Sequence, residues 1–65
     1  MNMRRHYIAF WDDGHDRGDF TFYSEHRARS KANFEDAHQQ AVRNYGYKRA
    51  ACMSIYHSQL ECRDY

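Results

Sequence analysis

The residues whose types and spacing best fit metal chemistry lie near the C-terminal end of the chain. Cys52, His57 and Cys62 are spaced Cys-x4-His-x4-Cys, and zinc prefers thiolate and imidazole ligands. Structural zinc sites normally use four ligands in closely spaced pairs, and positions 52 and 57 of a strand point to opposite faces. We therefore expect no metal site. A cytosolic setting keeps thiols reduced, so we expect free, partly buried cysteines rather than a disulfide.

Catalytic chemistry requires a nucleophile and a base that the fold brings together. The histidines are dispersed along the chain, and no serine or cysteine lies in a recognisable nucleophile motif. No glycine-rich phosphate loop is present. The aspartates of the first loop lack the spacing of a calcium-binding loop: Asp12, Asp13, Asp16 and Asp19. We expect no catalytic residue and no cofactor, and hence a protein that is not an enzyme.

A group of basic residues offers a different chemistry, the binding of an anion. Its members flank the first strand and the helix start that we expect below: Arg4, Arg5, Arg27, Arg29 and Lys31. Guanidinium groups beside the free amides of a helix N-terminus favour phosphate. The alternative is an ordinary solvated surface, because Glu25, Glu35 and Asp36 are close in sequence.

The first half of the chain has the pattern of a β-hairpin. His6 to Trp11 and Asp19 to Ser24 are rich in aromatic and β-branched residues, which favour strands. Between them, Asp12 to Gly18 has the glycine and aspartate content of a turn. Alternation places Ile8 and Phe10 on one side of the first strand. We expect Phe20 and Phe22 to face the same side from the second strand.

A helix and a third strand complete the pattern. Ser30 is a good N-cap, and Gly46 is placed to end the helix in a left-handed conformation. One apolar stripe has helical spacing and consists of Phe34, Ala37, Ala41 and Tyr45. We expect a third strand over residues 50–57, with Ala51, Met53 and Ile55 on its inner side. Residues 58–65 are expected to form a short edge strand or a loose tail.

These elements predict one small α+β domain over residues 1–65 with the order β-β-α-β. Placing the third strand beside the first gives a three-stranded antiparallel sheet of order 2-1-3, with one helix on one face. The other face is then left uncovered. On it we expect four aromatic side chains: Tyr7, Trp11, Tyr23 and Tyr56.

Such an aromatic face predicts a binding surface, because small domains rarely leave a large apolar patch in water. One interpretation is a homodimer interface or a site for a protein partner, since aromatic residues are enriched at interfaces. A second is a platform on which the rings stack single-stranded nucleic acid, with the basic residues holding phosphate. A third is a solvated face whose tyrosines keep their hydroxyl groups in water.

The composition fits a soluble domain without special charge. The chain has 65 residues, 29% of them charged, and a net charge of +1, which does not indicate a strongly basic nucleic-acid binder. No apolar run approaches the roughly 20 residues that a membrane helix needs. The two arginines near the start are not followed by a signal-peptide segment. We therefore expect a cytoplasmic protein without a membrane partner.

Residues 20–37 combine an aromatic strand (Phe20 to Ser24), a basic joint (His26, Arg27, Arg29) and a helix start (Ser30-Lys31-Ala32). This third of the chain resembles the strand-to-helix junction of short uncharacterised proteins encoded in phages and prophages. The resemblance implies an intracellular accessory protein that acts on a host factor, and it implies no catalytic residue. Together with the aromatic face, it leads us to expect a non-enzymatic interaction protein.

Overall fold

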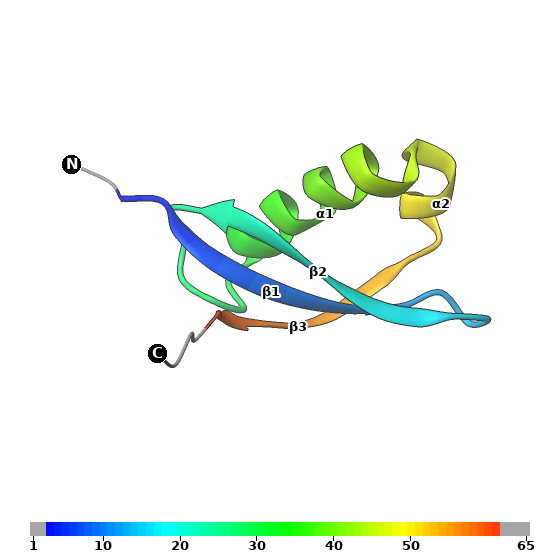
Figure 1. Cartoon of the computed structure of the whole chain (residues 1–65), viewed down its shortest axis with the longest axis horizontal. Coiled ribbons are helices and arrows are strands. Elements are labelled where there is room, and N and C mark those ends of the chain that lie inside the picture. Colours follow the sequence, from blue (N-terminus) through cyan, green and yellow to red (C-terminus); the bar gives the residue numbers. More distant parts are fainter. Residues whose placement is uncertain (1–2, 62–65) are drawn as a thin grey trace.

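The computed structural model describes residues 3–61, which form a three-stranded sheet with both helices on one side (Figure 1). The elements are β1 (Arg5–Asp12), β2 (Arg17–Ser24), α1 (Lys31–Tyr45), α2 (Tyr47–Ala51) and β3 (Ser54–Leu60). The strand order is β2-β1-β3, and both neighbouring pairs are antiparallel. The predicted fold is confirmed, with α2 as an added short helix.

The hairpin is closed by a four-residue loop, residues 13–16, between the paired residues Asp12 and Arg17. Aspartate side chains fix this loop by accepting backbone N–H groups, as they commonly do in turns. Asp13 Oδ1 accepts from the amides of His15 (2.9 Å) and Asp16 (2.6 Å), and Asp12 Oδ1 accepts from Gly14 (2.7 Å). These backbone donors lower the pKa of Asp13 below its ordinary value.

The loop length decides which residues of β1 face the helices, and here our expectation is wrong. Pairing Asp12 with Arg17 sets Tyr7 against Phe22 and Ala9 against Phe20, and directly paired residues share a face of the sheet. Phe20 and Phe22 are buried as expected, but their partners in the core are Tyr7, Ala9 and Trp11 rather than Ile8 and Phe10.

The register is also favoured by the room that Gly18 leaves for the Trp11 side chain. Gly18 is paired with Trp11, and a Cβ atom at position 18 would lie 3.1 Å from Cζ2 of the indole. The absence of a side chain at Gly18 therefore makes room for the largest ring of the chain. Trp11 also packs on Tyr45, with ring centroids 5.6 Å apart, and is only 4% exposed.

Helix α1 begins and ends where the sequence predicts. Ser30 Oγ accepts from the Asn33 amide, and Gly46 has φ = 92° while its N–H donates to the Val42 carbonyl. Ala37 and Ala41 are fully buried, and Tyr45 packs against the core. Phe34 is only half-buried, because the fully buried side chain in the first turn of α1 is that of Asn33.

The predicted third strand starts too early. Ala50 and Ala51 belong to α2, since Gly46 turns the chain directly into a second helical turn. Ala51 is exposed rather than in the core, whereas Met53 is buried and Ile55 packs against the core as expected. β3 then continues to Leu60, and the Glu61 amide donates to the His6 carbonyl. The expectation for the rest of the tail lies outside the described residues.

A buried polar network joins the segment before α1 to β3. Ser58 Oγ donates to Asn33 Oδ1 (2.7 Å) and accepts from the Arg29 amide (2.9 Å), while Asn33 Nδ2 donates to the His26 carbonyl (3.1 Å). Arg29 has a positive φ of 67°, a conformation that is uncommon for residues other than glycine. The network holds this residue and the following helix start at the edge of β3.

Candidate functional site

The uncovered face of the sheet has its apolar centre on β1, the middle strand. Ile8 and Phe10 alternate with the buried residues of β1 and therefore point away from the helices. Both are half-buried. Their neighbours on this face are Thr21 and Asp19 of β2, and Gln59 and His57 of β3. We call Ile8, Phe10, Tyr23 and His57 the open-face patch.

Ring contacts order both ends of the open-face patch. His6 and Tyr23 are stacked, with centroids 4.5 Å apart and an interplanar angle of 26°. Phe10 lies 5.6 Å from His57, and the Arg29 guanidinium approaches the His57 ring to 2.8 Å from Nδ1. A partner would therefore meet paired rings at both ends of the patch, with a cation beside His57.

A shallow hollow adjoins the open-face patch near the end of β3. It has a volume of about 460 Å³ and is lined by Ile8, Gln59, Leu60 and Glu61. Leu60 is 51% exposed. The His6 imidazole pairs with the Glu61 carboxylate at 2.5 Å and so fixes one rim. This hollow has room for an apolar side chain of a partner.

The structure separates the four aromatic residues that we expected on the uncovered face. Tyr23 and Tyr56 are 57% and 61% exposed. Tyr56 lies at an irregularity of β3, between the matched residues Ile55 and His57. The prediction for Tyr7 and Trp11 is wrong, because they are 1% and 4% exposed in the core.

Sequence reasoning assigned Ile8 and Phe10 to the core and did not place His57 on this face. Both strands of the hairpin have apolar residues on either side, so alternation alone does not choose a face. The signal that identifies the patch is the loop length: four loop residues pair odd positions of β1 with even positions of β2.

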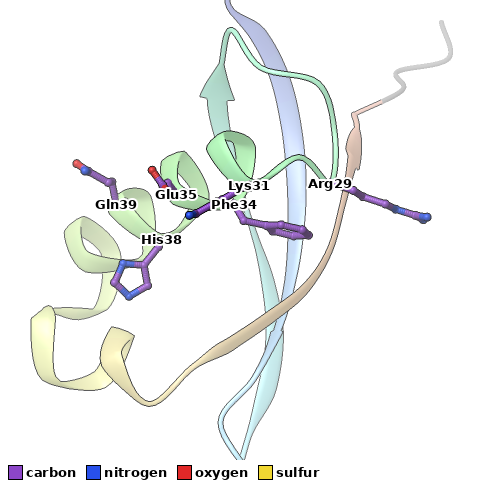
Figure 2. A pocket seen from close by; sticks show the side chains of 6 residues that line it. All are labelled: Arg29, Lys31, Phe34, Glu35, His38 and Gln39. Carbon is purple, nitrogen blue, oxygen red and sulfur yellow. The ribbon is translucent and has the colours of Figure 1, made fainter.

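The basic residues that we expected to lie together are found in different places. Arg29 and Lys31 line a hollow of about 640 Å³ together with Phe34, Glu35, His38 and Gln39. Figure 2 shows the Phe34 ring turned toward β3, while Arg29 points away from the other five side chains. Glu35 adds a carboxylate to the same lining, so the charge of this hollow is mixed.

The remaining basic residues lie elsewhere. Arg4 lines a second hollow with Tyr23, Ser24, Glu25, His26 and Asp36. Arg5 is the first residue of β1, paired with Ser24, and Arg27 lies in the segment before α1, where its carbonyl accepts from Ser30 Oγ. Arg4, Arg5 and Arg27 are exposed.

The residues considered for metal chemistry lie apart in the part of the chain that the structure describes. Within residues 3–61, no three His, Cys, Asp or Glu side chains are close enough to hold a metal ion. Cys52 is free, but it is exposed at the end of α2 rather than partly buried on a strand as expected, and Cys62 lies outside the described residues. Neither helix of the described chain is both long and apolar enough to cross a membrane.

Comparisons of the chain with protein-family models, with curated proteins and with solved structures found no match.

Proposed function

We propose that this is a non-enzymatic interaction module and that a protein partner docks on the open-face patch. The observation that carries the proposal is the position of Ile8 and Phe10. They occupy the centre of the middle strand on the face opposite both helices, and they are only half-buried.

Covering this surface with a partner would lower the free energy of the complex. Completing the burial of an apolar side chain stabilises a complex by roughly 25 cal/mol per Å² of apolar surface removed from water. Interfaces typically have an apolar centre surrounded by a polar rim. Here Ile8 and Phe10 supply the centre, and Asp19, Thr21 and Gln59 supply part of the rim.

Two features refine the proposed partner. The flat His6–Tyr23 stack fits an aromatic or aliphatic ridge, and Arg29 beside His57 favours a carboxylate at that edge. The resemblance of residues 20–37 to phage and prophage proteins suggests a bacterial host protein in the cytoplasm. A second copy of the chain remains an alternative occupant of this face, which the mass in solution tests.

A nucleic-acid partner is the rival proposal, and the structure supports it less well. Two of the rings expected to stack bases, Tyr7 and Trp11, are buried. Of the basic residues, Arg29 and Lys31 line one hollow and Arg4 lines another, each of which also has a carboxylate, while Arg5 and Arg27 line neither. Nucleic-acid binding weakens steeply with salt because counterions are released, whereas apolar docking does not. Retention of nucleic acid at low salt that Phe10→Ser abolishes would favour the rival.

The experiment is a comparative capture from a bacterial extract. The parent protein, Phe10→Ser and Tyr23→Ser are immobilised beside a matched control, Tyr47→Ser, whose ring is 74% exposed on α2. We expect a protein that the parent and the control retain at both low and high salt, and that both open-face variants lose. Circular dichroism confirms that each variant is folded. Capture that Tyr47→Ser lowers as much as Phe10→Ser contradicts the proposal.

A further inference from the structure

The two edges of the sheet differ in how well they are protected against pairing with another strand. Along β3, the register shifts between the partners of Phe10 and Trp11. The segment before α1 also lies against this strand, through the Arg29 amide on Ser58 and the Arg29 guanidinium on His57. Bulges and covering segments are common means of blocking an edge.

The edge of β2 has no such protection among the described residues. All eight of its residues pair with β1 without a shift in register, and the strand has no proline. Within the described sheet, β1 is the only neighbour of β2. A hollow of about 320 Å³ between the end of β2 and α1, lined in part by Tyr23, Asp36 and Arg43, leaves space beside this edge.

The hydrogen bonds of the hairpin show which backbone groups point outward. The Asp13 amide bonds to the Asp16 carbonyl, so pair 13–16 is hydrogen-bonded and the bonded pairs alternate from there. Gly18, Phe20 and Phe22 therefore bond to β1. The N–H and C=O groups of Asp19, Thr21 and Tyr23 are directed away from it. The bond from Glu61 to the His6 carbonyl agrees, because it places His6 in the ladder with β3.

We propose that the β2 edge pairs with the β2 edge of a second copy, antiparallel and around a two-fold axis at Thr21. The two three-stranded sheets would become one sheet of six strands. This inference goes beyond the proposed function: it leaves Ile8, Phe10 and His57 of both open-face patches uncovered on the same side of the joined sheet, with Tyr23 beside the seam.

Charge complementarity favours a second copy, and it favours this register over those that set like charges against each other. An axis at Thr21 would set Asp19 opposite Tyr23 of the second copy. It would also bring Arg17, the first residue of β2, near Glu25 of the second copy, which directly follows the last residue of β2. Arg17 and Glu25 are exposed and make no ion pair within residues 3–61. Moving the axis to Asp19 sets Asp19 against its own copy, and moving it to Phe22 sets Asp19 against Glu25. Like charges directly opposite each other destabilise a strand pair.

The side chains around the axis also suit a strand pair. Thr21 meets its own copy, and threonine pairs are favourable across antiparallel strands. On the helix side, Phe20 would lie opposite Phe22 of the second copy, and this would extend the aromatic core across the axis. The odd-numbered residues that the pairing would cover, 17 to 25, are all exposed in the monomer, while Phe20 and Phe22 keep their buried places.

The first test is the mass of the full-length chain in solution over a concentration series, measured by sedimentation. We expect the parent to change from monomer to dimer. Thr21→Pro should stay monomeric, because proline removes the outward N–H and is tolerated only on edge strands. Thr21→Val is the matched control and should dimerise. A parent that is monomeric at every concentration overturns the inference, as does a dimer that Phe10→Ser abolishes and Thr21→Pro leaves intact.

A charge exchange provides a second test that does not depend on proline. Arg17→Glu and Glu25→Arg should each raise the dimer dissociation constant about tenfold or more, since two surface ion pairs become like-charge contacts. Mixing the two variants should restore association, because every opposed pair in the mixed dimer then has opposite charges. A mixture that associates no better than either variant alone contradicts the proposed register. The open-face capture is unaffected by either result.

Discussion

Replacing Trp11 by alanine tests the register of β1, on which the identity of the open-face patch depends. The indole is 4% exposed, its ring centroid lies 5.6 Å from that of Tyr45, and the Arg49 guanidinium lies 5.7 Å from its centre. Nε1 of Trp11 has no hydrogen-bond partner among the described residues, so the ring contributes by packing. Truncating a buried aromatic ring of this kind costs about 3–5 kcal/mol.

That loss is large for so short a chain. Domains typically have roughly 0.05–0.15 kcal/mol of stability per residue, or about 3–10 kcal/mol for 65 residues. We therefore expect Trp11→Ala to be largely unfolded or to melt far below the parent. The assay is thermal and urea unfolding followed by circular dichroism, because the variant lacks the indole. Phe10→Ala is the matched control, and its half-buried ring should cost less than Trp11→Ala does.

The contact between Trp11 and Gly18 allows a finer check of the same register. A Cβ atom at position 18 would lie 3.1 Å from Cζ2 and 3.3 Å from Nε1 of the indole, so Gly18→Ala should cost about 1–3 kcal/mol by overpacking. Combining it with Trp11→Phe, whose ring is shorter, should reduce that cost in a double-mutant cycle. A Trp11→Ala variant that melts like the parent, while Phe10→Ala unfolds, would refute the register.

Three further predictions concern the elements around the face. Ser58→Ala leaves Asn33 Oδ1 and the Arg29 amide without their shared hydroxyl and should cost about 1–3 kcal/mol in urea unfolding, whereas Ser58→Thr should cost less if its hydroxyl keeps both bonds. Asp13 has a pKa below the ordinary 3.8 in the folded state, so its ionised carboxylate stabilises the fold fully well above pH 3.8, and this stabilisation is lost as the pH falls through the lowered pKa. The difference in unfolding free energy between Asp13→Ala and the parent should therefore shrink at the lowest pH. A difference that stays constant with pH would contradict this. Ser30→Ala removes the N-cap of α1 and should lower stability by about 1 kcal/mol, and a melting temperature equal to that of the parent would show that the cap is not used.

The sequence predicts the fold because its strongest signals are local. The cap at Ser30, the left-handed Gly46 and the aspartate loop each determine a boundary from a few neighbouring residues. The strand order follows from handedness and short connections rather than from any single residue. Local signals do not determine β1, where apolar residues alternate on both faces and a one-residue change in loop length inverts the strand.

The candidate site was predicted less well because the register expected for β1 turns the wrong face of that strand toward the helices. Tyr23 and Tyr56 are exposed as expected, but Tyr7 and Trp11 exchange places with Ile8 and Phe10. Gly18 holds the information that distinguishes the two registers, since a glycine opposite Trp11 indicates that the indole lies over it. The start of β3 also depends on tertiary contacts. Ala50 and Ala51 suit a helix as well as a strand, and the packing of α2 against α1 decides between the two.

The most direct test of the central claim is the affinity of the captured protein for matched variants of this chain. Once the retained protein is purified, its dissociation constant is measured for the parent, Phe10→Ser and Tyr47→Ser. We predict a loss of about four- to tenfold for Phe10→Ser, since complete burial of such a ring is worth roughly 1.5–3 kcal/mol and Phe10 is already half-buried, and no change for Tyr47→Ser. Equal affinity of the parent and a folded Phe10→Ser variant would contradict docking on the open-face patch.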